Sequence, residues 1–164
     1  MTARSPIPLV ASLAMALGLA SPLVHGADTA GHTAWAAVDP MIGTGGDGHT
    51  FPGATVPFGM IQLSPDTAMP DFKHSYKYAA GYQFADTSLL GFSHTHFSGS
   101  GHSDLGDFLV MPIAGEVKLD PGTPDQPGSG YRSRFSHHTE KAEAGYYAVT
   151  LSDWNLAPGF GAET

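Results

Sequence analysis

Residues 91–107 read GFSHTHFSGSGHSDLGD, and the composition of this stretch decides how the chain around it can fold. Its seventeen residues hold three histidines, two aspartates, four serines and four glycines. Glycine and serine disfavour helix interiors, so we exclude a helix here. Alternating bulky and polar residues from Phe92 to Phe97 predict a strand that runs into a glycine-rich loop. An imidazole-rich loop between apolar strands indicates part of a polar ligand site.

On both sides of this stretch, short apolar runs are separated by glycine and proline. Val56–Leu63 and Phe108–Ile113 predict buried strands. Tyr131–Thr139 and Tyr146–Leu151 both alternate, which predicts an antiparallel hairpin with its turn at Glu140–Gly145. Strands at intervals of about 10 residues, without a helical period, predict an all-β fold, an antiparallel β-sandwich.

The two ends of the chain differ from this central region. Residues 1–26 combine Arg4 with an interrupted apolar run and small residues up to Gly26, which predicts a cleaved secretory signal rather than a membrane anchor. The mature protein is therefore expected to be secreted or periplasmic, without a membrane partner. Residues 27–37 are expected to be a flexible lead-in and residues 38–154 the sandwich domain. Residues 155–164 continue neither the alternation nor a turn, so we expect an aberrant or truncated tail and a sandwich incomplete at its C-terminal end.

Composition and charge narrow the function classes. The 164 residues carry a formal net charge of −8, with 15 acidic against 7 basic residues. Nucleic-acid binding needs a basic surface, so this balance excludes a nucleic-acid partner. The absence of cysteine excludes disulfides and thiolate chemistry. Aspartate, glutamate and histidine remain as the side chains able to bind metal or transfer protons.

The histidine cluster leaves three interpretations open. His94 and His96 would share one face of a strand, and could ligate a metal, contact a polar ligand or hydrogen-bond within the fold. Asp104 and Asp107 lie close in sequence, but turn capping is the usual role of aspartate in loops. The spacing therefore assigns neither a catalytic residue nor a metal ligand.

Four segments, taken together, resemble the N-terminal domain of glycoside hydrolase family 92. They are VDPMIGTGGDGHTFPGATVPFGMIQLSPD (38–66), AAGYQF (79–84), LLGFSHTHFSGSGHSDLGDFLVMP (89–112) and AGYYAVTL (144–151). The family comprises calcium-dependent, inverting exo-α-mannosidases. The resemblance implies a mannose-containing glycan as substrate and calcium as cofactor. It also implies a C-terminal helical domain, missing from this sequence, that supplies the general acid, the general base and the main calcium ligands.

Carried over to this sequence, the resemblance implies that the domain forms one wall of the substrate pocket. The implied substrate-binding residues are His94, His96, Ser98, Gly99, His49, Gly45, Gly46 and Tyr76. We expect His94 and His96 to line the face turned toward the helical domain rather than the sandwich core. Tyr76 replaces a tryptophan that contacts the leaving-side sugar in α-1,2-mannosidases, so the resemblance does not extend to α-1,2 linkage preference.

Two functions follow as expectations. The first is the N-terminal carbohydrate-site domain of an inverting α-mannosidase, truncated before the catalytic domain and inactive alone. The alternative is a secreted β-sandwich module that binds carbohydrate without cleaving it. A structural domain that binds metal through its histidines is a third, weaker interpretation.

Overall fold

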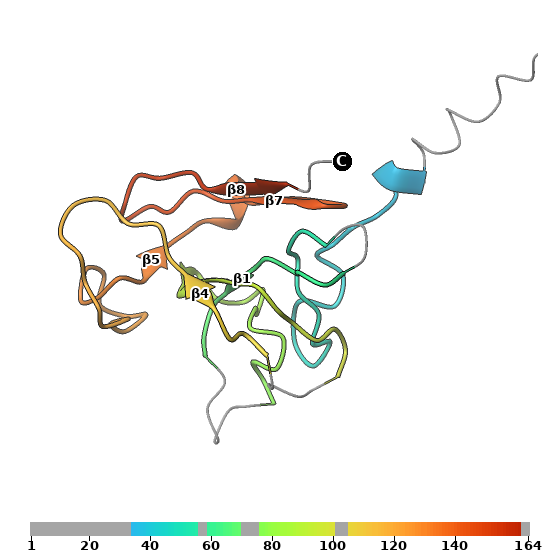
Figure 1. Ribbon diagram of the computed structural model, residues 1–164, viewed down its shortest axis with the longest axis horizontal. Helices are drawn as coiled ribbons and strands as arrows, with labels where there is room; N and C mark the ends of the chain where they lie inside the picture. The colour runs from blue at the N-terminus through green and yellow to red at the C-terminus, as the bar shows by residue number, and fades with distance from the viewer. Residues whose placement is uncertain (1–33, 56–58, 70–75, 101–104, 162–164) are drawn as a thin grey trace, which may run out of the picture.

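The computed structural model describes residues 34–55, 59–69, 76–100 and 105–161, so the predicted signal lies outside the described residues. Apart from one helical turn at residues 34–36 and one 3-10 turn, η1, their regular structure is β-strand (Figure 1). The elements in order are β1 (Ser64–Asp66), β2 (Ser88–Leu89), β3 (Gly91–Ser93), β4 (Leu109–Val110), β5 (Ser133–Arg134), η1 (His137–Thr139), β6 (Lys141–Glu143), β7 (Tyr146–Ala148) and β8 (Gly159–Gly161). The described residues contain no helix long and apolar enough to cross a membrane.

The strands form three small sheets in which every pairing is antiparallel. One sheet has the order β1-β3-β4, a second pairs β2 with β5, and the third has the order β6-β7-β8. In the first sheet Phe92 lies opposite Pro65 on one side and Val110 on the other. The β7–β8 ribbon runs above β1 and β4 in Figure 1. The all-β, antiparallel prediction is confirmed.

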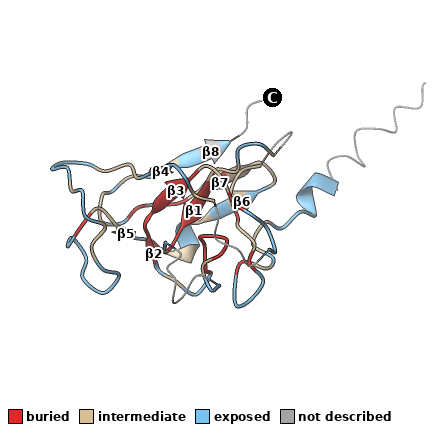
Figure 2. Cartoon of the chain, turned by 60° about the horizontal axis from the view of Figure 1, so that its bottom comes forward, coloured by how far each residue is buried: buried red, intermediate tan, exposed pale blue. Residues whose placement is uncertain are grey.

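The core lies between the first and third sheets. Phe92 of β3 and Tyr147 of β7 are fully buried, and their ring centroids are 6.4 Å apart. Five further buried side chains complete this cluster: Tyr82, Leu89, Phe135, Val149 and Leu151. Figure 2 shows the buried strands at the centre, enclosed by exposed loops. Two sheet faces that meet across a shared apolar layer give the sandwich arrangement expected from the alternation.

The predicted hairpin is wrong in its pairing. Strand β7 pairs with β6, which occupies the segment expected to be the turn, whereas β5 pairs with β2. Two residues, Ala144 and Gly145, connect β6 to β7, and Gly145 has φ +75°. Glycine adopts this backbone conformation without steric cost, so a tight turn forms there instead of a six-residue one.

Two strand predictions also need correction in their bounds. The first strand begins at Ser64, after the predicted Val56–Leu63, and Met60 and Ile61 are exposed. Residues 56–58 of that prediction lie outside the described residues. Strand β4 covers only part of Phe108–Ile113; it lies at the edge of its sheet, and Val110 is exposed.

The tail joins the sandwich rather than departing from it. Leu151 and Leu156 form an isolated antiparallel bridge around a turn in which Asn155 has φ +53°. Strand β8 then pairs with β7. Through residue 161 this segment therefore continues the third sheet.

Candidate functional site

A glycine loop at residues 43–50 carries the first group of predicted site residues. Thr50 closes the loop, because its N–H donates to the Gly43 carbonyl over 3.3 Å and its hydroxyl donates to the Ile42 carbonyl over 2.8 Å. A Cβ at Gly48 would lie 2.2 Å from the Gly43 oxygen, so only glycine fits there. This closure buries His49 at φ +52°, while Gly45 and Gly46 remain exposed.

Three predicted segments meet around His49. The Gly99 N–H donates to the His49 carbonyl over 2.5 Å, which joins the turn at residues 97–99 to the glycine loop. The ring of Tyr76 meets the imidazole edge-on, with the centroids 4.4 Å apart at 77°. Gln83 joins the glycine loop to the segment that follows Tyr76, because its side-chain amide donates to the Gly46 carbonyl over 3.1 Å and also to the Lys77 carbonyl. The structure thus brings together predicted residues that lie 50 positions apart in the chain (49 and 99).

The His49 side chain is the unusual group at this junction. The residue is only 5% exposed, and neither ring nitrogen has a hydrogen-bond partner among the described residues. Leaving a buried polar group unpaired costs about 1–3 kcal/mol. A neutral imidazole offers one donor and one acceptor, which a hydroxyl can satisfy in either role. Both nitrogens are buried, so a ligand would meet this junction at the exposed ring of Tyr76 rather than at the imidazole.

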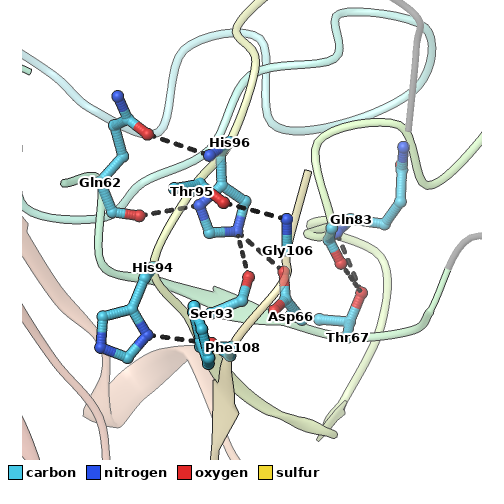
Figure 3. A network of polar contacts seen from close by, with 11 residues as sticks. Gln62, Asp66, Thr67, Gln83, Ser93, His94, Thr95, His96, Gly106 and Phe108 are labelled. Carbon is cyan, nitrogen blue, oxygen red and sulfur yellow. Dashed lines mark hydrogen bonds and ion pairs between the residues drawn. The ribbon is translucent and has the colours of Figure 1, made fainter. Parts of the chain in front are cut away.

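His96 departs from the open position expected for it. It is 7% exposed, and its Nδ1 lies 2.8 Å from the Gln62 carbonyl oxygen. Its Nε2 lies 2.9 Å from both Asp66 Oδ1 and Ser93 Oγ (Figure 3). The expectation of a water-facing imidazole is wrong because Asp66 and Gln62, from the β1 region, supply buried polar partners.

His94 lies apart from this network. Its Nδ1 is 2.9 Å from the Phe108 carbonyl oxygen, and Figure 3 shows its ring directed toward Phe108 rather than His96. The two imidazoles do not share a strand face, because β3 ends at Ser93. His102 and Asp104 lie outside the described residues, and Asp107 is exposed.

A second polar cluster was not predicted from the sequence. Glu140 Oε1 accepts hydrogen bonds from the hydroxyls of Tyr82 (2.7 Å) and Tyr147 (2.6 Å), and its Oε2 lies 2.5 Å from His137 Nδ1. Burial, with the Glu140 charge beside them, raises the pKa of the Tyr82 and Tyr147 phenols well above their usual range. His137 also stacks on Phe84 with a 4.3 Å centroid separation. No local motif links Tyr82 to Glu140, which are 58 residues apart.

The described residues do not fit a calcium ion on their own. Across the four described ranges, no three histidine, cysteine, aspartate or glutamate side chains are grouped to hold a metal. The buried carboxylates of Asp66 and Glu140 already pair with histidine, and Glu140 also accepts from two tyrosines. We assign no chemistry through a metal to these residues.

Comparison of the sequence and structure with known proteins identifies the family of this chain. The model of the glycosyl hydrolase family 92 N-terminal domain matches residues 37–162. The chain belongs to glycosyl hydrolase family 92. The match includes strand β8, in agreement with the place of that segment in the third sheet.

Solved structures and a curated relative agree with the family. The family GH92 α-mannosidase BT3965 from Bacteroides thetaiotaomicron superposes with a TM-score of 0.71 at 48% identity, over 77% of this chain and 16% of its own, and has also been solved with mannoimidazole. The inverting GH92 mannosidase BT2199 from the same organism gives a TM-score of 0.54 at 27% identity, over 76% and 16% of the two chains. An uncharacterized secreted glycosidase from Arthroderma benhamiae is 32% identical over 71% of this chain and 14% of its own length. The chain therefore spans about one sixth of the length of these relatives.

Proposed function

We propose that this chain is the carbohydrate-site domain of a secreted or periplasmic, inverting α-mannosidase that acts on mannose-containing glycans. Three similar proteins support this proposal. One is an α-mannosidase solved with mannoimidazole, another is an inverting mannosidase, and a third is a secreted glycosidase. In this proposal the domain forms one wall of the substrate pocket. The general acid, the general base and the calcium ligands belong to the C-terminal helical domain of the enzyme.

The observation that carries the proposal is the junction of Tyr76, His49 and Gly99. The exposed ring of Tyr76 packs on the buried imidazole of His49, whose carbonyl accepts from the Gly99 N–H. A sugar combines hydroxyls, which pair with polar groups, with an apolar ring face, which packs against an aromatic side chain. The exposed groups of this junction, Tyr76, Ser98 and the Gly45–Gly46 backbone, offer both kinds of contact.

The remaining site residues have supporting roles. Gly45 and Gly46 are exposed and lack side chains, so a ligand can approach their backbone closely. Ser98 is exposed on the turn that docks on His49 and offers a hydroxyl. His94 lies farther along the same segment, beside Phe108, and His96 acts from inside the domain.

The test is the affinity of the purified chain for mannoimidazole, measured by titration. Asparagine tolerates a left-handed backbone, so His49→Asn removes the imidazole while keeping the loop conformation. We expect an affinity loss of about tenfold or more, equivalent to about 1.4 kcal/mol. His138→Asn, at an exposed histidine of η1, is the matched control and should bind like the wild type. Equal binding by His49→Asn, with an unchanged unfolding midpoint, would contradict the proposal.

The alternative is a module that binds carbohydrate without cleaving it. The two buried carboxylates, Asp66 and Glu140, are hydrogen-bonded within the domain, which favours this alternative because neither is free to act as an acid or base. Incubation with an aryl α-mannoside and calcium tests where the acid and base lie. We expect no mannose release by this chain, and release above the blank would place catalytic groups within it.

A further inference from the structure

The hydrogen bonds of His96 determine where its protons lie. A backbone carbonyl can only accept, so Nδ1, at 2.8 Å from the Gln62 oxygen, carries a hydrogen. On its other side, Nε2 lies 2.9 Å from Asp66 Oδ1, and a lone pair facing a carboxylate oxygen would be repulsive. A proton between Nε2 and Oδ1 is therefore required. With that proton on Nε2, and Nδ1 also protonated, the arrangement is an imidazolium–carboxylate pair.

The surroundings of this pair contain no competing charge among the described residues. Asp66 is 4% exposed, and Ser93, Gln62 and the ring of Phe51 are the neutral groups that contact the imidazole. The small hollow beside the pair is otherwise lined by Ala68, Met69, Gly81, Leu105 and Gly106. Asp66 is thus the single titratable partner of His96 in the described part of the chain.

The pair is linked through the backbone to the junction around His49. His96 immediately precedes the turn at residues 97–99, whose Gly99 N–H donates to the His49 carbonyl. The His96 backbone N–H donates to the side-chain oxygen of Gln62 over 3.0 Å, which further restrains the backbone at this position. Gly81 packs against Asp66 Oδ1 so closely that a Cβ there would lie 1.8 Å away. Gly81, which ends the turn that follows Tyr76, therefore lies directly against the same two side chains.

We propose that Asp66 and His96 are positioning residues, whose buried ion pair holds the 97–99 turn against His49. Neither side chain contacts the ligand. The pair acts through the backbone that follows His96. The consequence for sugar binding rests on the proposed function, whereas the consequence for the turn does not.

Hydrogen exchange at the Gly99 amide tests the effect on the turn. Asp66→Asn keeps the size of the side chain but removes its charge, and we expect Gly99 to exchange about tenfold faster or more, the size of a lost charge-assisted hydrogen bond. The Leu151 amide, which donates to Leu156 over 2.7 Å, should keep its protection and so report an intact core. Glu140→Gln is the matched control, because it also neutralises a buried carboxylate paired with a histidine, His137, but in a separate cluster with Tyr82 and Tyr147. It should leave Gly99 exchange unchanged.

Ring-nitrogen NMR of His96 tests the proton count. The wild type should show both ring nitrogens protonated at neutral pH, and Asp66→Asn should show one. A single protonated nitrogen in the wild type, unchanged exchange at Gly99, or an equal rise in exchange at Gly99 and Leu151 would each overturn the proposal. Faster Gly99 exchange with unaltered mannoimidazole affinity would uphold the positioning pair and count against the proposed sugar site.

Discussion

Alanine in place of Gly81 would bring its Cβ to 1.8 Å from Asp66 Oδ1 and 3.4 Å from His96 Nε2. Gly81 also has φ +78°, where a side chain costs about 1–2 kcal/mol. Displacing the carboxylate breaks a hydrogen bond to a charged partner, worth about 1.5–3 kcal/mol. Together these terms predict that Gly81→Ala lowers the free energy of unfolding by about 2.5–5 kcal/mol.

Gly128→Ala separates the two terms. Gly128 has φ +79°, almost the same backbone conformation, but a Cβ there would meet nothing within 4 Å. We expect this control to lose only the backbone term of about 1–2 kcal/mol. Urea unfolding is the assay, followed by the fluorescence of Trp154, which packs against the core and donates to the Tyr131 carbonyl over 3.0 Å. Losses equal to within about 0.5 kcal/mol would refute the idea that Gly81 is needed for the Asp66–His96 pair.

Two further predictions concern pH. The phenols of Tyr82 and Tyr147 have a pKa raised by burial and by Glu140, so the folded state keeps protons that the unfolded chain releases above its ordinary pKa of about 10. The contribution of these phenols to the free energy of unfolding is therefore fully present below about pH 10 and falls at higher pH. Tyr147→Phe should halve the slope of this free energy against pH above about pH 10, and an unchanged slope would contradict this. The hydrogen bond from Arg134 lowers the pKa of Asp153, so the contribution of this carboxylate is present above its ordinary pKa of about 4 and is lost as pH falls below it. In urea unfolding, Asp153→Asn should lower the midpoint at pH 7 and have little effect near pH 2. An equal loss at both pH values would exclude the Asp153 charge as the cause.

The fold class and the site loops follow from local sequence, because their causes are local. Alternation around Phe92 and Tyr147 places these rings in the core, and glycine at position 48 is needed within its own loop. The structure brings His49, Tyr76 and Gly99 into contact, and their role in binding stays a prediction of the family resemblance. Strand pairing could not be predicted in the same way, because the partners of β2 and β7 depend on turn geometry at Gly145 and on packing across the sandwich.

The burial of His96 shows the same limit at the level of one side chain. Its sequence neighbours are polar and glycine-rich, which indicates an open loop. Its actual partners, Asp66 and the Gln62 carbonyl, lie 30 and 34 residues earlier in the chain. No spacing rule connects such positions, so only the folded backbone reveals that this imidazole is internal while His49 has unpaired nitrogens.

A map of amide chemical-shift changes during titration of the chain with mannoimidazole shows where the sugar analogue binds. We expect the changes to centre on His49 and spread to Tyr76, Gly99 and the exposed Gly45–Gly46 backbone, the groups that meet at one junction. Changes centred on another surface, such as the apolar groove between Leu109 and Leu119, would contradict it. The absence of any change at saturating mannoimidazole would contradict it as well.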